Sequence, residues 1–241
     1  MMFRLILTGV IASLIGAKSF ANDITQPVSV NISLKKAYFP VGFDSNDRIQ
    51  FAVEGELVNS CFKMGSYTVK VDKESRRIEV YQQAYVYLGY CLMMIIPFST
   101  IVDVGVLENP GEYTIIDGAN KKILGKLPIV AANGSGQDDY LYAPLEDAYV
   151  TTSDTSPKQS LVLTGYFPDR CMEFSEVKIN MFSDAIVVQP IVKQVAKVGG
   201  CPPEKIRFIK TVPFIDDLHG AYLLHVRSLN GAAINRVLEF Q

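Results

Sequence analysis

The side chains best suited to chemistry in this chain are its four cysteines, which fall at a regular spacing. Cys61 and Cys91 lie 30 residues apart, and so do Cys171 and Cys201. Cysteine pairs can form disulfides, hold a metal or exchange electrons. The chain has no Cys-x-x-Cys motif and only two histidines, which disfavours a metal site or a redox pair. We therefore expect two structural disulfides.

The two cysteine pairs are related by an offset of 110 residues, and neighbouring residues keep this register. Gly55 maps to Gly165, and Gly111-Glu112-Tyr113 maps to Gly220-Ala221-Tyr222 after a one-residue deletion. This pattern predicts one unit written twice. A duplicated unit should close the same bond in each copy, and a loop of about 30 residues stabilises a domain by roughly 3–4 kcal/mol. The predicted bonds are Cys61–Cys91 and Cys171–Cys201.

The two histidines are the candidates for hydrolytic chemistry, which needs an imidazole beside a nucleophile. Alternation places His225 with Leu223 and Arg227, opposite Tyr222, Leu224 and Val226, and we expect it on the solvent side of a strand. His219 follows two aspartates, and we expect the polar side chains of that turn to face solvent rather than to bind a metal. A hydrolase is therefore the least favoured alternative, and we expect no enzyme activity, no cofactor and no metal.

A turn of acidic residues, Asp44-Ser45-Asn46-Asp47, invites a calcium interpretation. It lacks the glycine and the distal glutamate of a 12-residue calcium loop. Asp and Asn side chains that cap their own turn account for it without a cation.

The clearest candidate for binding is an aromatic and methionine-rich stretch around the second cysteine of the first copy. Tyrosine and methionine make an adaptable contact surface when they are exposed. The alternative is that Tyr85 and Tyr87 are strand residues that pack on the first core or against the second domain. In the second copy, counting from the cysteine aligns Tyr85, Tyr87 and Tyr90 with Val195, Lys197 and Gly200. The candidate partner-binding residues are Tyr85, Tyr87, Tyr90, Met93 and Met94.

Short period-2 patterns bounded by Gly and Pro turns dominate the chain, whereas helical periodicity is scarce. The fold class is therefore all-β, with two tandem antiparallel β-sandwich domains of Ig-like architecture and about seven strands per copy. Asp117-Gly118 and Asn230-Gly231 predict two-residue hairpins. Gly55 and Gly165 predict bulges or bends where a Cβ would clash.

The N-terminus has the pattern of an export signal, with a basic start, an apolar run at residues 5–16 and a Ser-Phe-Ala cleavage site. We expect cleavage after Ala21, the alternative being an uncleaved anchor, and no transmembrane segment in the mature chain. The predicted organisation is signal peptide 1–21, first sandwich 22–131, linker 132–139 with the composition of a flexible joint, and second sandwich 140–241. The formal net charge of −2 excludes the basic patch typical of nucleic-acid binders.

The arrangement Val53-x-Gly55-x-Leu57-x3-Cys61, then Cys91, then Gly111-x-Tyr113 resembles β-sandwich repeats of uncharacterised activity in secreted and envelope proteins of bacteria. The resemblance covers both halves of the mature chain and implies the fold and an envelope location, but no functional residue.

These observations predict a non-catalytic binding or structural module of the bacterial cell envelope, periplasmic or secreted. Its partner would be an envelope protein or glycan and not a nucleic acid. The main alternative is an inhibitor or chaperone-like adaptor that offers an edge strand to a client by β-augmentation.

Overall fold

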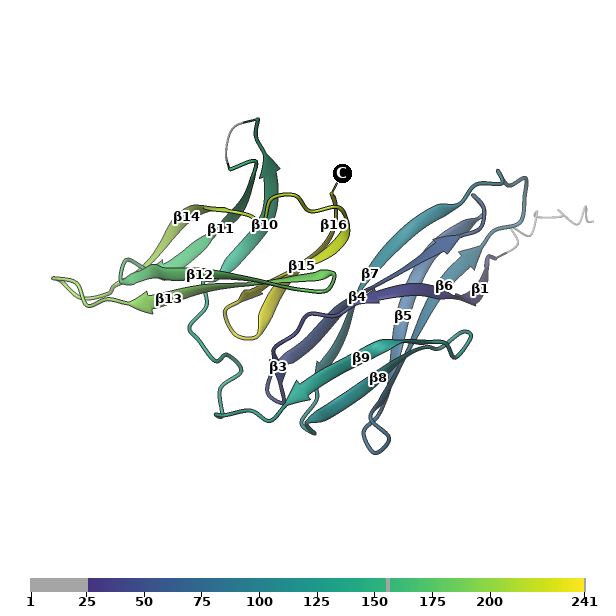
Figure 1. The fold of residues 1–241 in the computed structure, drawn as a ribbon, viewed down its shortest axis with the longest axis horizontal. Helices are drawn as coiled ribbons and strands as arrows, with labels where there is room; N and C mark the ends of the chain where they lie inside the picture. The colour runs from purple at the N-terminus through teal and green to yellow at the C-terminus, as the bar shows by residue number, and fades with distance from the viewer. Residues whose placement is uncertain (1–25, 155–156, 241) are drawn as a thin grey trace, which may run out of the picture.

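The computed structural model describes residues 26–154 and 157–240, and every regular element in that part of the chain is a β-strand (Figure 1). The strands form two antiparallel β-sandwiches in tandem, here called the N-terminal and C-terminal sandwiches, and each contains one disulfide. The predicted fold class is confirmed. The expected signal peptide at residues 1–21 lies outside the described residues.

The N-terminal sandwich packs a three-stranded sheet, ordered β2-β4-β7, against a sheet of β1, β3, β5, β6, β8 and β9. The three-stranded sheet is wholly antiparallel, whereas the other sheet contains parallel pairs at β6–β8 and β3–β9. The strands are β1 (Val28–Ile32), β2 (Leu34–Tyr38), β3 (Phe43–Asp44), β4 (Arg48–Leu57), β5 (Phe62–Asp72), β6 (Arg77–Val86), β7 (Ile96–Val106), β8 (Gly111–Asp117) and β9 (Ile123–Val130).

The C-terminal sandwich repeats this plan with fewer strands. Its three-stranded sheet has the order β10-β11-β14 and its four-stranded sheet the order β12-β13-β15-β16. These correspond to β2-β4-β7 and to β5-β6-β8-β9 of the N-terminal sandwich. The strands are β10 (Leu145–Thr152), β11 (Gln159–Asp169), β12 (Met172–Phe182), β13 (Ala185–Gln194), β14 (Pro203–Pro213), β15 (Gly220–Ser228) and β16 (Ala232–Phe240).

Alternating apolar residues of the two sheets fill each core. Ile49, Phe51 and Val53 of β4 point into the N-terminal core, and Leu161 and Leu163 of β11 into the C-terminal one. This is the period-2 burial expected of strands with one face on a core.

Gly55 and Gly165 occupy the same structural position, opposite a bulge in the neighbouring edge strand. The register shifts between Leu34 and Lys36 in one sandwich and between Leu145 and Asp147 in the other. A Cβ at Gly55 would lie 2.5 Å from the Phe98 ring, and one at Gly165 would fall on the carbonyl oxygen of Pro144. The prediction of a crowded site at a bulge is confirmed for both glycines.

The two hairpin predictions have different outcomes. Asp117-Gly118 is not a two-residue hairpin, because residues 118–122 all lie between β8 and β9. The Asp117 carboxylate instead accepts hydrogen bonds from the backbone N–H groups of Leu34 and Ala119, both at 2.9 Å, which ties this turn to β2. Asn230 and Gly231, with φ of 61° and 67°, lie in the turn between β15 and β16 as predicted, but the connection has three residues, 229–231, rather than two.

The two sandwiches are docked against each other. The outer face of the β2-β4-β7 sheet contributes Tyr38, Ala52 and Ile101, which pack against Ala185 and Leu223 of the C-terminal sandwich. Figure 1 shows β4 and β7 beside β15 and β16 at this junction.

The predicted linker is held to both sandwiches. The side-chain amide of Asn46 donates to the carbonyl of Gly134 at 2.5 Å, and the Asp138 carboxylate accepts from the backbone of Asn230 at 2.8 Å. After the linker, Tyr142 forms an isolated antiparallel β-bridge with Ile191 of β13. This bridge corresponds in position to the pairing of β1 with β6 in the N-terminal sandwich. These bonds restrict the freedom expected from the composition of the linker.

Candidate functional site

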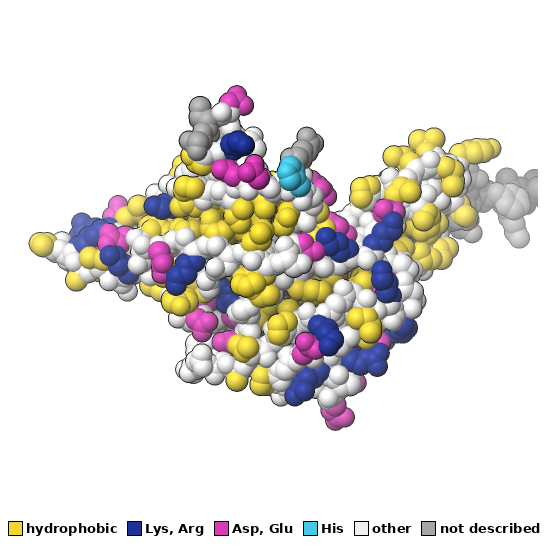
Figure 2. All heavy atoms as spheres, viewed as in Figure 1, with side chains coloured by type: hydrophobic (Ala, Val, Ile, Leu, Met, Phe, Trp, Pro, Cys, Tyr) yellow, Lys and Arg dark blue, Asp and Glu magenta, His cyan; other side chains and the backbone are white. Residues whose placement is uncertain are grey.

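The stretch of residues 87–95, here called the apolar loop, joins β6 to β7 at one end of the N-terminal sandwich. Apart from the half-buried Cys91, every residue in it is exposed. Figure 2 shows hydrophobic side chains gathered at this end of the molecule. Large apolar side chains exposed together are uncommon on soluble proteins and mark contact sites. The exposed large apolar residues are Tyr87, Leu88, Tyr90, Leu92, Met93, Met94 and Ile95.

All five residues predicted to bind a partner lie on exposed surface. Tyr87, Tyr90, Met93 and Met94 belong to the apolar loop, and Tyr85 lies two residues before it at the end of β6. Met93 is 86% exposed, whereas Tyr85 is only 37% exposed. The alternative, that Tyr85 and Tyr87 pack on the first core or against the second sandwich, is wrong for Tyr87, which is 46% exposed. The role of all five residues in binding stays a prediction.

The apolar loop is held at its base by covalent and hydrogen bonds. Cys91 is bonded to Cys61, as predicted. Ser60 donates its N–H to the carbonyl of Leu92 at 3.1 Å and accepts the Leu92 N–H on its hydroxyl at 2.8 Å. Tyr87 donates to the carbonyl of Cys61 at 3.0 Å. The loop is thus fixed at both ends, which lowers the entropy that it would lose on binding.

Charge is absent from the loop and from the parts of β6 and β7 that adjoin it. No Asp, Glu, Lys or Arg occurs between Glu79 and Asp103. Burial of each large apolar side chain is worth about 1.5–3 kcal/mol, and no charged group in this stretch would oppose it.

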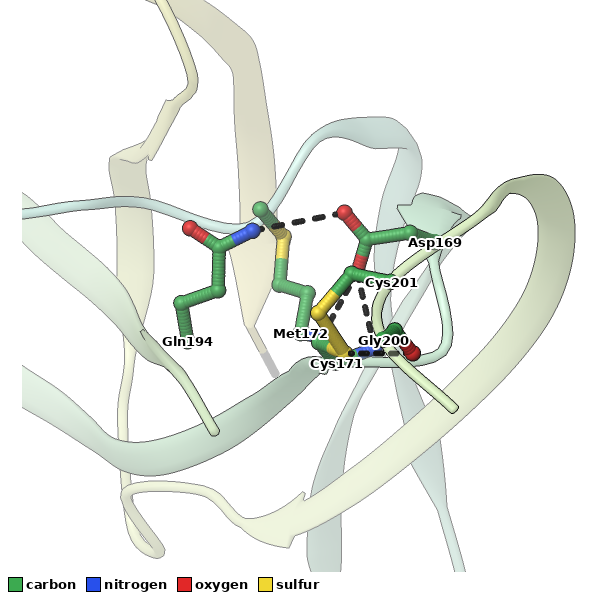
Figure 3. The surroundings of a disulfide bond; sticks show 6 residues. All are labelled: Asp169, Cys171, Met172, Gln194, Gly200 and Cys201. Atoms are coloured by element: carbon green, nitrogen blue, oxygen red, sulfur yellow. Dashed lines mark hydrogen bonds between the residues drawn. A yellow bond between two sulfur atoms is a disulfide. The ribbon is translucent and has the colours of Figure 1, made fainter. Parts of the chain in front are cut away.

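The corresponding loop of the C-terminal sandwich has the same base and a different surface. It spans residues 195–202 and is closed by the predicted Cys171–Cys201 bond. The Asp169 carboxylate accepts the N–H of Cys171 at 2.7 Å and that of Met172 at 3.1 Å, and Figure 3 shows it beside the disulfide. Asn59 caps Cys61 in the same way, at 3.0 Å.

A carboxylate beside two sulfurs has the outline of a metal site. Asp169, Cys171 and Cys201 meet within 4.8 Å of one another. The sulfurs are joined in a disulfide and are not thiolates, the form in which cysteine binds metals. The carboxylate is occupied by backbone donors. The cluster is therefore a structural turn.

The residue correspondence obtained by counting back from the second cysteine of each sandwich is wrong for Tyr85 and Tyr87. Tyr85 is paired with Lys63, and in the C-terminal sandwich Lys193 is paired with Glu173. Likewise, Tyr87 donates to the carbonyl of Cys61 and Val195 to that of Cys171. The counterparts of Tyr85 and Tyr87 are therefore Lys193 and Val195, because the segment between the strand and the cysteine is two residues longer in the C-terminal sandwich.

His225 is buried, and the prediction of a solvent-side histidine is wrong. It is 2% exposed, on the face of β15 that also carries Leu223 and Arg227. The prediction that Leu224 and Val226 lie on the opposite face of this strand is correct. The face is not solvated because the N-terminal sandwich covers it, and the ring of Phe43 lies 5.5 Å from that of His225.

Sequence reasoning missed the buried ion pair between the sandwiches. Arg227 binds both carboxylate oxygens of Asp47, at 3.0 and 3.1 Å, and also the carbonyl of Gly42. Asp44 caps the same turn by accepting the N–H groups of Asn46 and Asp47 at 2.8 and 3.2 Å. The side-chain capping proposed for this acidic turn is confirmed, and the cation that Asp47 meets is Arg227.

Burial has a large effect on the titration of His225. It lowers the pKa of the imidazole to about 4, and the nearby Arg227 charge acts in the same direction. The hydrogen bond with Asn235, 2.7 Å from Nδ1 to the amide oxygen, opposes this shift. Asn235 in turn donates to Gln50 of the N-terminal sandwich at 2.7 Å. His225 is thus a neutral, structural group whose polar partner is an amide, while His219 is exposed before β15.

Comparison with known proteins supports the fold of the N-terminal half. Residues 51–122 match the ORF11 beta-sandwich domain. No curated protein and no solved structure matches the chain. Within the described residues, no helix has the length and apolar character needed to cross a membrane. The matched region runs from β4 to the connection after β8 and includes the whole apolar loop, so residues 51–122 are similar to an ORF11 beta-sandwich domain.

Proposed function

We propose that this protein is an exported, non-catalytic binding module of the bacterial cell envelope and that it binds through the apolar loop. The observation that carries the proposal is the loop itself, a run of exposed apolar side chains without a charge, fixed at its base by a disulfide. Exposure of such a surface opposes solubility, and a binding role offsets that disadvantage.

Export is supported by the leader pattern at residues 1–21 and by the two disulfides. Disulfides form and persist in oxidising compartments such as the periplasm and the extracellular space. The matching strand orders and the equivalent positions of Gly55 and Gly165 further support descent of the two sandwiches from one duplicated unit.

The polar groups best able to act in catalysis already have structural roles. His225 and Arg227 belong to the interface between the sandwiches, and the carboxylates of Asp44 and Asp47 hold the facing turn. A catalytic imidazole needs a nucleophile or a carboxylate within hydrogen-bond reach, but the partner of His225 is the amide of Asn235. This arrangement favours binding over hydrolysis.

The test is capture of partners by the mature chain, residues 22–241, from extracts of its own envelope. Replacement of Tyr85, Tyr87 and Tyr90 by serine should abolish capture of the proteins or glycans retained by the wild type. The matched control is Val198→Ser, which removes an exposed apolar side chain from the corresponding C-terminal loop. Unchanged capture by a folded triple variant would refute the proposal.

A second candidate is β-augmentation at the free edge of β7, which among the described strands pairs only with β4. Edge strands usually carry charges that prevent further pairing. The 11 residues of β7 contain one charged residue, Asp103, whereas its counterpart β14 contains Glu204, Lys205, Arg207 and Lys210.

The surroundings of β7 place this candidate second. An added strand should also find an apolar groove, but the groove of about 300 Å³ beside Pro97, Phe98 and Ser99 is also lined by Lys35 and several glutamates. The exposed Ser99 gives the test. Replacement of Ser99 by lysine should block addition of a strand at this edge. Loss of capture in Ser99→Lys together with normal capture in the triple tyrosine variant would favour the edge over the loop.

A further inference from the structure

We propose that the apolar loop inserts into the surface of a lipid bilayer. This inference rests on the proposed function and names the partner of the same site. The partner would be the apolar boundary of the membrane, just beneath the headgroups.

The form of the surface is the first argument. A protein partner usually meets a flat patch or fills a groove. The apolar loop is instead a protruding tip in which residues on both sides of the half-buried Cys91 are exposed. Leu88 is 74% exposed and Tyr90 is fully exposed, so both could bury their side chains in a fluid medium that closes around the tip. A bilayer is such a medium.

The composition is the second argument. A charged side chain in the bilayer interior costs about 2.5–3.5 kcal/mol even on the lowest scales, and none occurs between Glu79 and Asp103. Tyrosines favour the membrane interface because their rings are apolar and their hydroxyls polar. Tyr85 and Tyr87 lie at the base of the loop, and the apolar Leu92, Met93 and Met94 lie beyond the cysteine.

The path of the chain is the third argument. Strand β1 begins at Val28, which pairs with Val86 directly before the apolar loop. The apolar run of the leader, residues 5–16, therefore connects to this end of the molecule. The intervening residues 17–27 can span at most about 40 Å when fully extended. Before the leader is removed, the apolar loop is therefore within reach of the bilayer that the leader occupies.

The C-terminal loop lacks these properties. Its surface carries Lys193 at the end of β13, Lys197, and Arg170 beside Gly199. Val198 is fully exposed there, but it is the only large apolar residue so exposed in the loop. The same architecture therefore supplies an internal control.

The absence of tryptophan from the chain allows a direct test. We would prepare mature Leu92→Trp and, as a control, mature Val198→Trp, each with one tryptophan at an exposed position. Both would be mixed with vesicles of phosphatidylethanolamine and phosphatidylglycerol, and with vesicles of phosphatidylcholine. The readouts are the shift of tryptophan emission and its quenching by lipids brominated along the acyl chain.

We expect a blue shift and quenching for Leu92→Trp with both kinds of vesicle and no change for Val198→Trp. Because the loop is uncharged, the shift should persist in ~1 M salt, where the Debye length falls to about 3 Å. A second variant pair measures the loop itself. Leu92→Asp with Met93→Asp should lower the vesicle-bound fraction at least ~10-fold in cosedimentation, whereas Val198→Asp should leave it unchanged.

Absence of a shift for a folded Leu92→Trp protein with every vesicle would overturn the inference, and so would equal shifts at positions 92 and 198. If capture from envelope extracts still depended on the loop tyrosines in that case, the proposed function would stand with a protein or glycan as the partner. If the loop failed in both assays, the proposed function would also be wrong.

Discussion

The two disulfide-closed loops have the same base and opposite surfaces. In both, an Asn or Asp side chain caps the first cysteine, and the residue directly after β6 or β13 donates its N–H to that cysteine's carbonyl. Above this base, one loop presents Leu88, Tyr90 and Leu92, and the other presents Lys197 and Val198. The base therefore follows from the fold, and the two sandwiches differ in the surface above it.

The outer faces of the sheets show a similar contrast. The outer face of β2-β4-β7 is covered by the C-terminal sandwich, which buries Tyr38 and Ala52. The same face of β10-β11-β14 leaves Tyr149 and Ile209 exposed. The docking surface that covers the first face is built around β15 and includes the buried polar residues His225 and Arg227.

The largest effect should come from the buried ion pair that joins the sandwiches. Arg227→Met leaves the Asp47 carboxylate buried without its cation, which should destabilise the folded chain by about 3–5 kcal/mol in urea unfolding. Arg236 makes a similar bond with Asp147, at 2.6 Å, but on exposed surface. Arg236→Met should therefore cost about 0–1 kcal/mol. Equal costs would show that the buried ion pair contributes no more to stability than the exposed one.

Removal of the disulfides tests whether the two loop bases are equivalent. Replacement of either pair by alanine should reduce the stability of its own sandwich by roughly 3–4 kcal/mol. Cys171 is fully buried and Cys61 is not. The C-terminal sandwich should therefore lose more stability, because removal of the buried sulfur also removes packing contacts. Chemical unfolding followed by proteolysis would assign each loss to one half. A loss confined to the same half in both variants would contradict the equivalence.

The pH dependence of stability should depend on one of the two histidines. Because the pKa of His225 is lowered to about 4 in the folded chain, unfolded chains bind the additional proton as the pH falls below about 6.5. Stability should then fall by on the order of 3 kcal/mol between about pH 6.5 and pH 4.

His225→Gln should remove that part of the slope and leave the part due to carboxylates. The matched variant His219→Gln, at an exposed position, should retain the wild-type slope. The measurement is urea unfolding at several pH values in this range. Identical slopes for the two variants would place the origin of the pH dependence elsewhere.

The smallest effect separates the two glycines opposite the bulges. Gly55→Ala meets the backbone oxygen of Ser33 at 2.9 Å, a small overlap, and the ring of Phe98, which can rotate away, so we expect a loss of about 1–2 kcal/mol. Gly165→Ala meets the backbone of Pro144, which cannot, so the loss should be larger, about 3 kcal/mol. Thermal unfolding of both variants would rank them. The reverse order would mean that β10 yields more easily than the Phe98 ring.

Local patterns were sufficient for the parts of this protein that depend on neighbours in sequence. The shared spacing of the cysteines predicted both disulfides. Period-2 alternation indicated the strands and correctly divided residues 222–227 of β15 between its two faces. The capping role of Asp44 also followed from the turn alone. Disulfide pairing, strand periodicity and side-chain capping are all encoded within short segments or by a repeated spacing.

The tertiary structure decided what each face and loop meets. Alternation shows that His225 and Arg227 share a face, but only the docked N-terminal sandwich makes that face a dry interface. The counterpart of Tyr87 could be identified only from its bond to Cys61, because a difference in loop length does not show in the distance between cysteines. Exposure of the apolar loop is equally a property of the assembled chain, since burial depends on residues that are distant in sequence and close in space.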